Sequence, residues 1–153
     1  MSDTAYSFEA GAGRQFGDLL SARPPLRERP RVGLLACGYF EYWRMFSPQF
    51  KVNVLGDLER IAERLRQDAE VVVPCVVDTL DSADRAGRVF AQSDLDLLVV
   101  VEGTYVPDYI SLHAIDCVPH VPVGMFTTQV EEDIAPEDNY ETLMRNSALI
   151  GTA

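Results

Sequence analysis

The chain lacks any long apolar segment and carries little positive charge. No run of 18 or more apolar residues occurs, which is the length that a membrane-spanning helix needs. Lys and Arg number 13 against 24 Asp and Glu, and the resulting net charge of −11 repels a phosphate backbone. The sequence therefore predicts a protein that binds neither a membrane nor a nucleic acid.

Cysteine and histidine are too sparse to build a disulfide framework or a metal site. Cys37, Cys75 and Cys117 are odd in number, far apart and without a C-x-x-C pair, which is typical of free thiols in a reducing cytoplasm. His113 and His120 have no carboxylate or second ligand at a matching spacing. We expect a cytoplasmic protein with no metal ligand and no catalytic residue in this chain, because no triad or nucleophile elbow is visible either.

Glycine motifs that bind phosphate are also missing. No Walker A sequence occurs, and the G-x-G-x-x-x-G pattern of residues 11–17 precedes the first predicted strand instead of following it. The turn after that strand holds Gly38 alone, which is a poor cradle for a pyrophosphate or a flavin phosphate. A flavin is therefore the least favoured ligand.

What the chain does have is a regular alternation of apolar runs and amphipathic segments. Residues 1–30, rich in Arg and Pro, predict a flexible N-terminal extension. Residues 38–43 predict an aromatic loop, and the helix after Pro107 is expected to bury Tyr109, Leu112 and Ile115. The strands are predicted at 32–37, 71–77, 95–101 and 121–126, and the helices at 55–66, 80–91, 107–115 and 138–148.

Strict alternation of strands and helices predicts a fold of the α/β class. It implies parallel strands with right-handed crossovers and helices on both faces, hence a three-layer α/β/α arrangement. Pro74 lies within the second strand and suits the edge of a sheet. The first and third strands are the most apolar, so we predict a flavodoxin-like, doubly wound sheet with the strand order 2-1-3-4.

A binding site in such a sheet lies at the carboxyl ends of the strands, where the strand order reverses. The loops there are rich in rings and in neutral polar groups, which suit a polyhydroxylated ligand: rings stack on C–H faces, and hydroxyls and amides pair with ligand hydroxyls. The predicted substrate-binding residues are Tyr39, Tyr42, Glu102, Thr104, Tyr105, Thr127 and Gln129.

Structural roles are an open alternative for several of these side chains. Trp43 and Tyr105 are equally suited to packing or to a subunit interface, and Gln129 to stabilising its own loop. Glu102 is the only acid predicted at the site. One carboxylate cannot hold a divalent ion, so a role as a hydrogen-bond acceptor or in helix capping is favoured for it.

Two short motifs resemble the N-terminal domain of the L-arabinose isomerases and, more distantly, of the L-fucose isomerases. The family's G-S-Q-H-L-Y-G loop corresponds to residues 37–43, where the family's tyrosine falls on Tyr42 and its glutamine is replaced by Tyr39. The family's Q-F-H-T-Q motif corresponds to residues 125–129; Phe126, Thr128 and Gln129 match. Residues 146–153 resemble the start of a further element of the family, and the whole resemblance spans 31–153.

The resemblance implies a role for the parent protein. Its members are aldose–ketose isomerases that use a divalent metal, usually Mn²⁺, held by two glutamates and two histidines of later domains, none of which can be assigned here. The substrate lies between that metal and the N-terminal domain of a neighbouring subunit of a trimer or hexamer. The resemblance thus implies that residues 31–153 are a truncated, substrate-capping and oligomerisation domain that binds a sugar and carries no cofactor itself.

A second function stays open on the sequence alone. The chain is equally compatible with a free-standing flavodoxin-like module that binds a small ligand or a protein partner through its aromatic loops, without catalysis.

Overall fold

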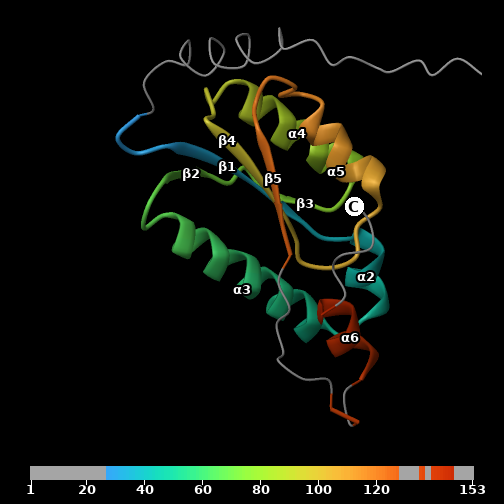
Figure 1. The fold of residues 1–153 in the computed structure, drawn as a ribbon. Helices are drawn as coiled ribbons and strands as arrows, with labels where there is room; N and C mark the ends of the chain where they lie inside the picture. The colour runs from blue at the N-terminus through green and yellow to red at the C-terminus, as the bar shows by residue number, and fades with distance from the viewer. Residues whose placement is uncertain (1–26, 128–134, 137–138, 147–153) are drawn as a thin grey trace, which may run out of the picture.

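The fold is an alternating series of strands and helices. The computed structural model describes residues 27–127, 135–136 and 139–146 (Figure 1). The strands are β1 (Arg31–Cys37), β2 (Glu70–Val72), β3 (Val76–Val77), β4 (Leu97–Glu102) and β5 (Val123–Phe126). The helices are α2 (Phe40–Met45), α3 (Pro48–Leu65), α4 (Leu80–Ala91), α5 (Asp108–Ile115) and α6 (Tyr140–Asn146).

The strands form one sheet in the order β2-β1-β4-β5, and all pairings between the described strands are parallel. β3 also pairs with β1, two residues beyond Pro74, so β2 and β3 are two halves of the single strand predicted at 71–77. Counted in that way, the four strands follow the predicted order. Proline has no N–H to donate to a ladder, which explains the interruption at this outer position.

Helices cover both faces of the sheet (Figure 1). Leu34 and Ala36 of β1 face α3, where Phe50, Val54 and Leu58 complete one core. The alternate residues of β1 face the other way, towards α4 and α5. Their core contains Leu35, Cys37, Phe90, Ile110 and Ala114. β1 therefore contributes to a core on each face of the sheet, which confirms the three-layer α/β fold. Burial on both faces also explains why this strand is apolar throughout.

Two predictions about the helices are wrong. The segment predicted as an aromatic loop forms the short helix α2, whose rings pack against α3. In α5 the buried residues are Ile110, Ser111 and Ala114; of the predicted residues Ile115 packs partly buried against the core, whereas Tyr109 and Leu112 are 54% and 45% exposed. That helix is apolar around most of its circumference, so its hydrophobic pattern does not select one face.

Both ends of the described chain are attached to the body. Arg27 bonds to Asp94, and Arg29 donates to the carbonyl of Ala69 at 3.2 Å; residues 1–26 of the predicted extension lie outside the described residues. At the other end Glu141 of α6 accepts hydrogen bonds from Ser47, the residue that caps α3. No described helix is both long and apolar enough to cross a bilayer.

Candidate functional site

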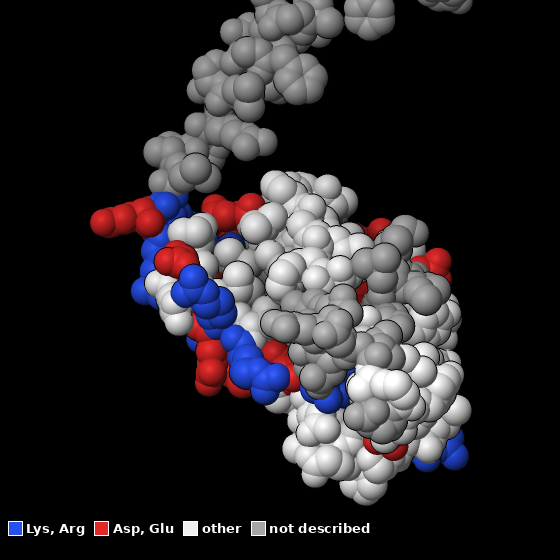
Figure 2. All heavy atoms as spheres, turned by 60° about the horizontal axis from the view of Figure 1, so that its bottom comes forward, with Lys and Arg blue, Asp and Glu red and all other residues white. Residues whose placement is uncertain are grey.

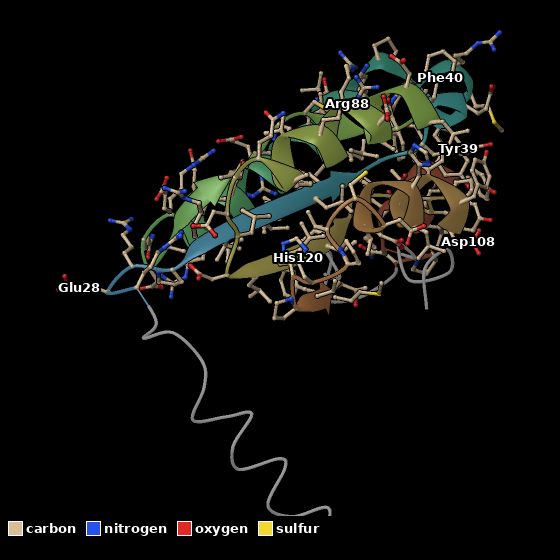
Figure 3. All side chains as sticks on the ribbon, turned by 90° about the horizontal axis from the view of Figure 1, so that it is seen from above. Glu28, Tyr39, Phe40, Arg88, Asp108 and His120 are labelled. Carbon is tan, nitrogen blue, oxygen red and sulfur yellow. The ribbon has the colours of Figure 1, made fainter. Side chains whose placement is uncertain are left out.

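The predicted site residues follow strands that end side by side. Cys37, the last residue of β1, is in register with Glu102, the last residue of β4. The backbone N–H of Gly38 donates to Val77 at 2.9 Å, and that of Gly103 donates to Cys37 at 2.9 Å, which fixes where both loops leave the sheet. Figure 3 shows Tyr39 and Asp108, from the loop after β1 and the start of α5, at the end of the molecule opposite Glu28.

Three of the predicted tyrosines form a cluster at this carboxyl edge. The ring centroids of Tyr39 and Tyr42 lie 5.3 Å apart, and those of both residues lie 6.4–6.5 Å from Tyr105. The contacts are edge-to-face or tilted, as the quadrupoles of aromatic rings favour. The structure therefore brings Tyr39 and Tyr42, at the start of α2, together with Tyr105, which lies 63 positions or more further along the sequence.

Further rings extend this tyrosine cluster towards α3 and α6. The centroid of Phe46 lies 5.1 Å from Tyr42, 4.7 Å from Phe50 and 5.6 Å from Tyr140. Burial raises the pKa of Tyr42, and the neighbouring phenols of Tyr140, Tyr105 and Tyr39 raise it further. Through its contact with Phe46, Tyr140 adds a ring to this edge that the sequence did not predict.

Glu102 is an acid enclosed at the end of the central strand. Its side chain points to the α4 and α5 face, like Leu98 and Val100 at alternate positions of β4, and the residue is only 2% exposed. Its Oε1 atom has no hydrogen-bond partner, and burial raises the pKa of the carboxyl to about 7. A buried carboxyl oxygen without a hydrogen-bond partner carries a desolvation cost, which agrees with the raised pKa.

The remaining predicted residues have less direct access to a ligand. Thr104 is fully buried, and its hydroxyl donates to the carbonyl of Tyr105 at 3.0 Å. Thr127 directly follows β5 and is half-buried. Thr128 and Gln129 lie outside the described residues.

Trp43 has a structural role at this edge. Its Nε1 donates to Asp78 Oδ2 at 2.9 Å, and the Nζ of Lys51 lies 5.4 Å from the centroid of its ring. The indole covers Gly38 so closely that a Cβ there would stand 2.5 Å from a ring carbon, which explains the glycine. This supports the packing interpretation for Trp43 and fixes α2 to the loop before α4.

Two hollows border the helices at this edge. The α2–α5 hollow, of about 250 Å³, is bounded by α2, the loop between β3 and α4, and the start of α5. Tyr39 lines it, and the other described site residues predicted from the sequence do not. The α3–α6 hollow, of about 270 Å³, is lined mainly by polar side chains such as Gln49, Asn53 and Asn139. Neither hollow could be located from the sequence, because each combines helices that are distant along the chain.

The chemistry available here is that of binding. Among the described residues no group of three or more His, Cys, Asp or Glu side chains gathers to hold a metal ion. The thiol of Cys37 is fully buried, and burial, followed by the charge of Glu102, raises its pKa, so it is inert as a nucleophile. Rings, phenols and one enclosed carboxyl remain, and these groups can stack on a ligand and exchange hydrogen bonds with it.

Comparisons with known proteins found no matching family model, curated protein or solved structure.

Proposed function

We propose that this chain is a non-catalytic domain that covers a polyhydroxylated ligand with the carboxyl edge of its sheet. In this proposal it is the substrate-capping N-terminal domain of a metal-dependent aldose–ketose isomerase of the L-arabinose or L-fucose type. The observation that carries the proposal is the tyrosine cluster of Tyr39, Tyr42 and Tyr105 at that edge. Phenols offer a sugar both a ring face for its C–H groups and a hydroxyl for its own hydroxyls.

In this proposal, this chain and the other domains of the parent protein have different roles. Mn²⁺ chemistry belongs to other domains, since the described residues of this chain do not fit a metal centre. This chain orients the ligand and excludes water, and a neighbouring subunit of a trimer or hexamer supplies the reacting groups. Three free cysteines suit the cytoplasm as the compartment.

A titration with candidate ligands tests the proposal. We expect L-arabinose, L-fucose or L-arabinitol to shift the amide resonances of residues 39–42 and 105 in a ¹⁵N-labelled sample, with a dissociation constant of about 1–50 mM, because one face of a divided pocket binds weakly. Trp43 is the only tryptophan, so its fluorescence reports on the same edge.

Two variants of Tyr42 distinguish the contribution of its ring from that of its hydroxyl to ligand binding. Tyr42→Phe keeps the ring contacts and should weaken binding about threefold, whereas Tyr42→Ala should weaken it at least tenfold. Val52→Ala, an exposed change on α3 outside the cluster, should leave binding unaltered. If none of the three polyols perturbs these resonances at about 100 mM, the carbohydrate assignment is wrong.

A protein-interaction module without catalysis is the second candidate. It is favoured by the apolar side chains on β5, the last strand of the described sheet, where Val123, Met125 and Phe126 are each 45% exposed. Exposed apolar groups on an edge strand are typical of a surface that another chain covers. Sedimentation separates the candidates: a concentration-independent monomer that binds no polyol supports the module.

A further inference from the structure

The α2–α5 hollow shares Tyr39 with the tyrosine cluster, but the rest of its lining comes from other residues. Its volume of about 250 Å³ is bounded by Tyr39 and Phe40 at the start of α2, by Asp78 before α4, and by Tyr109 in α5. Phe40 and Tyr109 are 43% and 54% exposed. In Figure 3, Tyr39 and Phe40 lie at the same end of the molecule. The hollow is open to a ligand from solvent.

An anion is the usual occupant of such a position, because helices that follow parallel strands direct the positive ends of their dipoles there. In this hollow, side chains of the protein itself already bind or neutralise the helix N-termini. Thr79 and Ser82 cap α4 reciprocally, and Ser82 Oγ also accepts from the N–H of Asp78. Asp81 in the first turn of α4 and Asp108 in that of α5 add negative charge. A phosphate or carboxylate is therefore disfavoured.

The lining instead suits a positive charge. Three aromatic residues and two acidic residues, Glu41 and Asp78, line one hollow, and no described Lys or Arg is among the lining residues. Aromatic faces and carboxylates both attract cations, and rings accept alkylated ammonium groups, whose charge is spread over methyl groups, especially well. The apolar side chains of Leu80 and Ile110 complete the lining and suit the carbon atoms of such a ligand.

One of the two carboxylates is held in place before any ligand arrives. Asp78 Oδ2 accepts from Trp43 Nε1 at 2.9 Å, and Asp78 Oδ1 accepts from Ser82 Oγ at 3.1 Å. Glu41 has a looser contact, 3.5 Å from Arg44 on the same helix. The negative charge of Asp78 therefore needs no reorganisation on binding, whereas Glu41 can turn towards a cation.

We propose that the α2–α5 hollow binds a small organic cation of the alkylated-ammonium class. The rings of Tyr39, Phe40 and Tyr109 contact its methyl groups, and Glu41 and Asp78 balance its charge. This site goes beyond the proposed carbohydrate function: it shares Tyr39 with the tyrosine cluster, whereas Tyr42 and Tyr105 lie outside its lining and Glu41, Asp78 and Tyr109 lie outside the cluster.

The test compares choline with 3,3-dimethylbutan-1-ol, a neutral molecule of the same shape. The full chain is titrated with each compound while the resonances of the Trp43 indole N–H and of residues 39–41 and 78–80 are followed. We expect choline to bind at least tenfold more tightly than the alcohol, and its binding to weaken as NaCl is added. Equal binding of the two compounds, or no shift with either, overturns the proposal.

Variants assign the effect to the hollow. Tyr109→Ala and Glu41→Gln change partly exposed side chains and should each weaken choline binding about fivefold or more. Tyr109→Phe retains the ring and should bind choline as the unaltered protein does; loss of binding in this variant would contradict a ring contact. Val52→Ala on α3 is the matched control and should not change choline binding. Binding that survives both Tyr109→Ala and Glu41→Gln places the cation elsewhere and overturns the assignment.

Discussion

Glu102 is an acid whose environment in the folded protein differs strongly from that in the unfolded chain. The side chain is 2% exposed, and its Oε1 has no partner. Burial disfavours the charged form, and this raises the pKa of the carboxyl from 4.5 to about 7. Burying this carboxyl lowers the free energy of unfolding at neutral pH. Acids with a strongly shifted pKa are common at functional sites.

The raised pKa predicts how Glu102 changes stability with pH. Between about pH 4.5 and pH 7 the folded protein keeps a proton that the unfolded chain has released, so this residue lowers the free energy of unfolding as the pH rises. Glu102→Gln removes that dependence. Relative to the unaltered protein, the variant should gain about 2 to 3 kcal/mol on going from pH 5 to pH 8, measured by urea unfolding.

The control for this measurement is Glu63→Gln, a change on the exposed face of α3. Its difference from the unaltered protein should stay constant within about 0.5 kcal/mol over the same pH range. A constant difference for Glu102→Gln as well would mean that the carboxyl is hydrated or paired in solution.

At the scale of elements, α6 is joined to α3 by an enclosed ion pair. Arg145 Nη2 lies 2.7 Å from Asp57 Oδ2, and the two side chains are 15% and 12% exposed. We expect a double-mutant cycle with Asp57→Ala and Arg145→Ala to give a coupling energy of about 1 to 3 kcal/mol, because little water screens the pair. Asp57 also contacts Arg60, and the cycle removes that contribution.

The pair of Asp84 and Arg88 on α4 supplies the comparison. Its distance of 2.6 Å is similar, but the side chains are 42% and 73% exposed. Its coupling energy, measured by the same unfolding experiment, should be below about 0.5 kcal/mol. Equal couplings for both pairs would show that α6 detaches from α3 before the rest of the chain unfolds.

The strands could be predicted from the sequence because burial on both faces leaves an unmistakable apolar run. The run at 95–101 became β4, and Pro74 marked the interrupted edge strand. Which face of each helix is buried was harder to predict. In α4 the buried residues Ala83, Ala86 and Phe90 recur at helical spacing. In contrast, α5 carries apolar residues on most sides, and its packing against α4 decides which of them are buried.

The site could be predicted only as far as the loops that follow the strands. Strand order placed Tyr39, Tyr42 and Tyr105 at one edge, and the structure brings these three together. Tyr140 and Asp78 were missed, because their positions depend on how α6 meets α3 and on the hydrogen bond from Trp43. No spacing along the chain encodes such contacts.

At the scale of the whole molecule, charge imbalance is the dominant electrostatic feature. Acidic residues outnumber basic ones by 24 to 13. Figure 2 shows acidic and basic side chains next to one another on the face that it presents. Ion pairs such as that of Glu59 with Arg66 join charges of opposite sign. Such pairs offset part of the repulsion locally, and the excess negative charge acts over longer distances.

This imbalance predicts that simple salt stabilises the protein. Repulsion within a compact chain of net charge −11 is relieved when the Debye length falls from about 30 Å at 0.01 M to about 6 Å at 0.3 M NaCl. We expect the midpoint of thermal unfolding at pH 7.5 to rise by about 3 °C, equivalent to about 1 kcal/mol. Near pH 4.5, the isoelectric point, the same addition of salt should have almost no effect, since the repulsion is absent there. A decrease at pH 7.5 would mean that ion pairs such as Asp57 with Arg145 contribute more to stability than the relief of repulsion, so calorimetry at both pH values decides between the two.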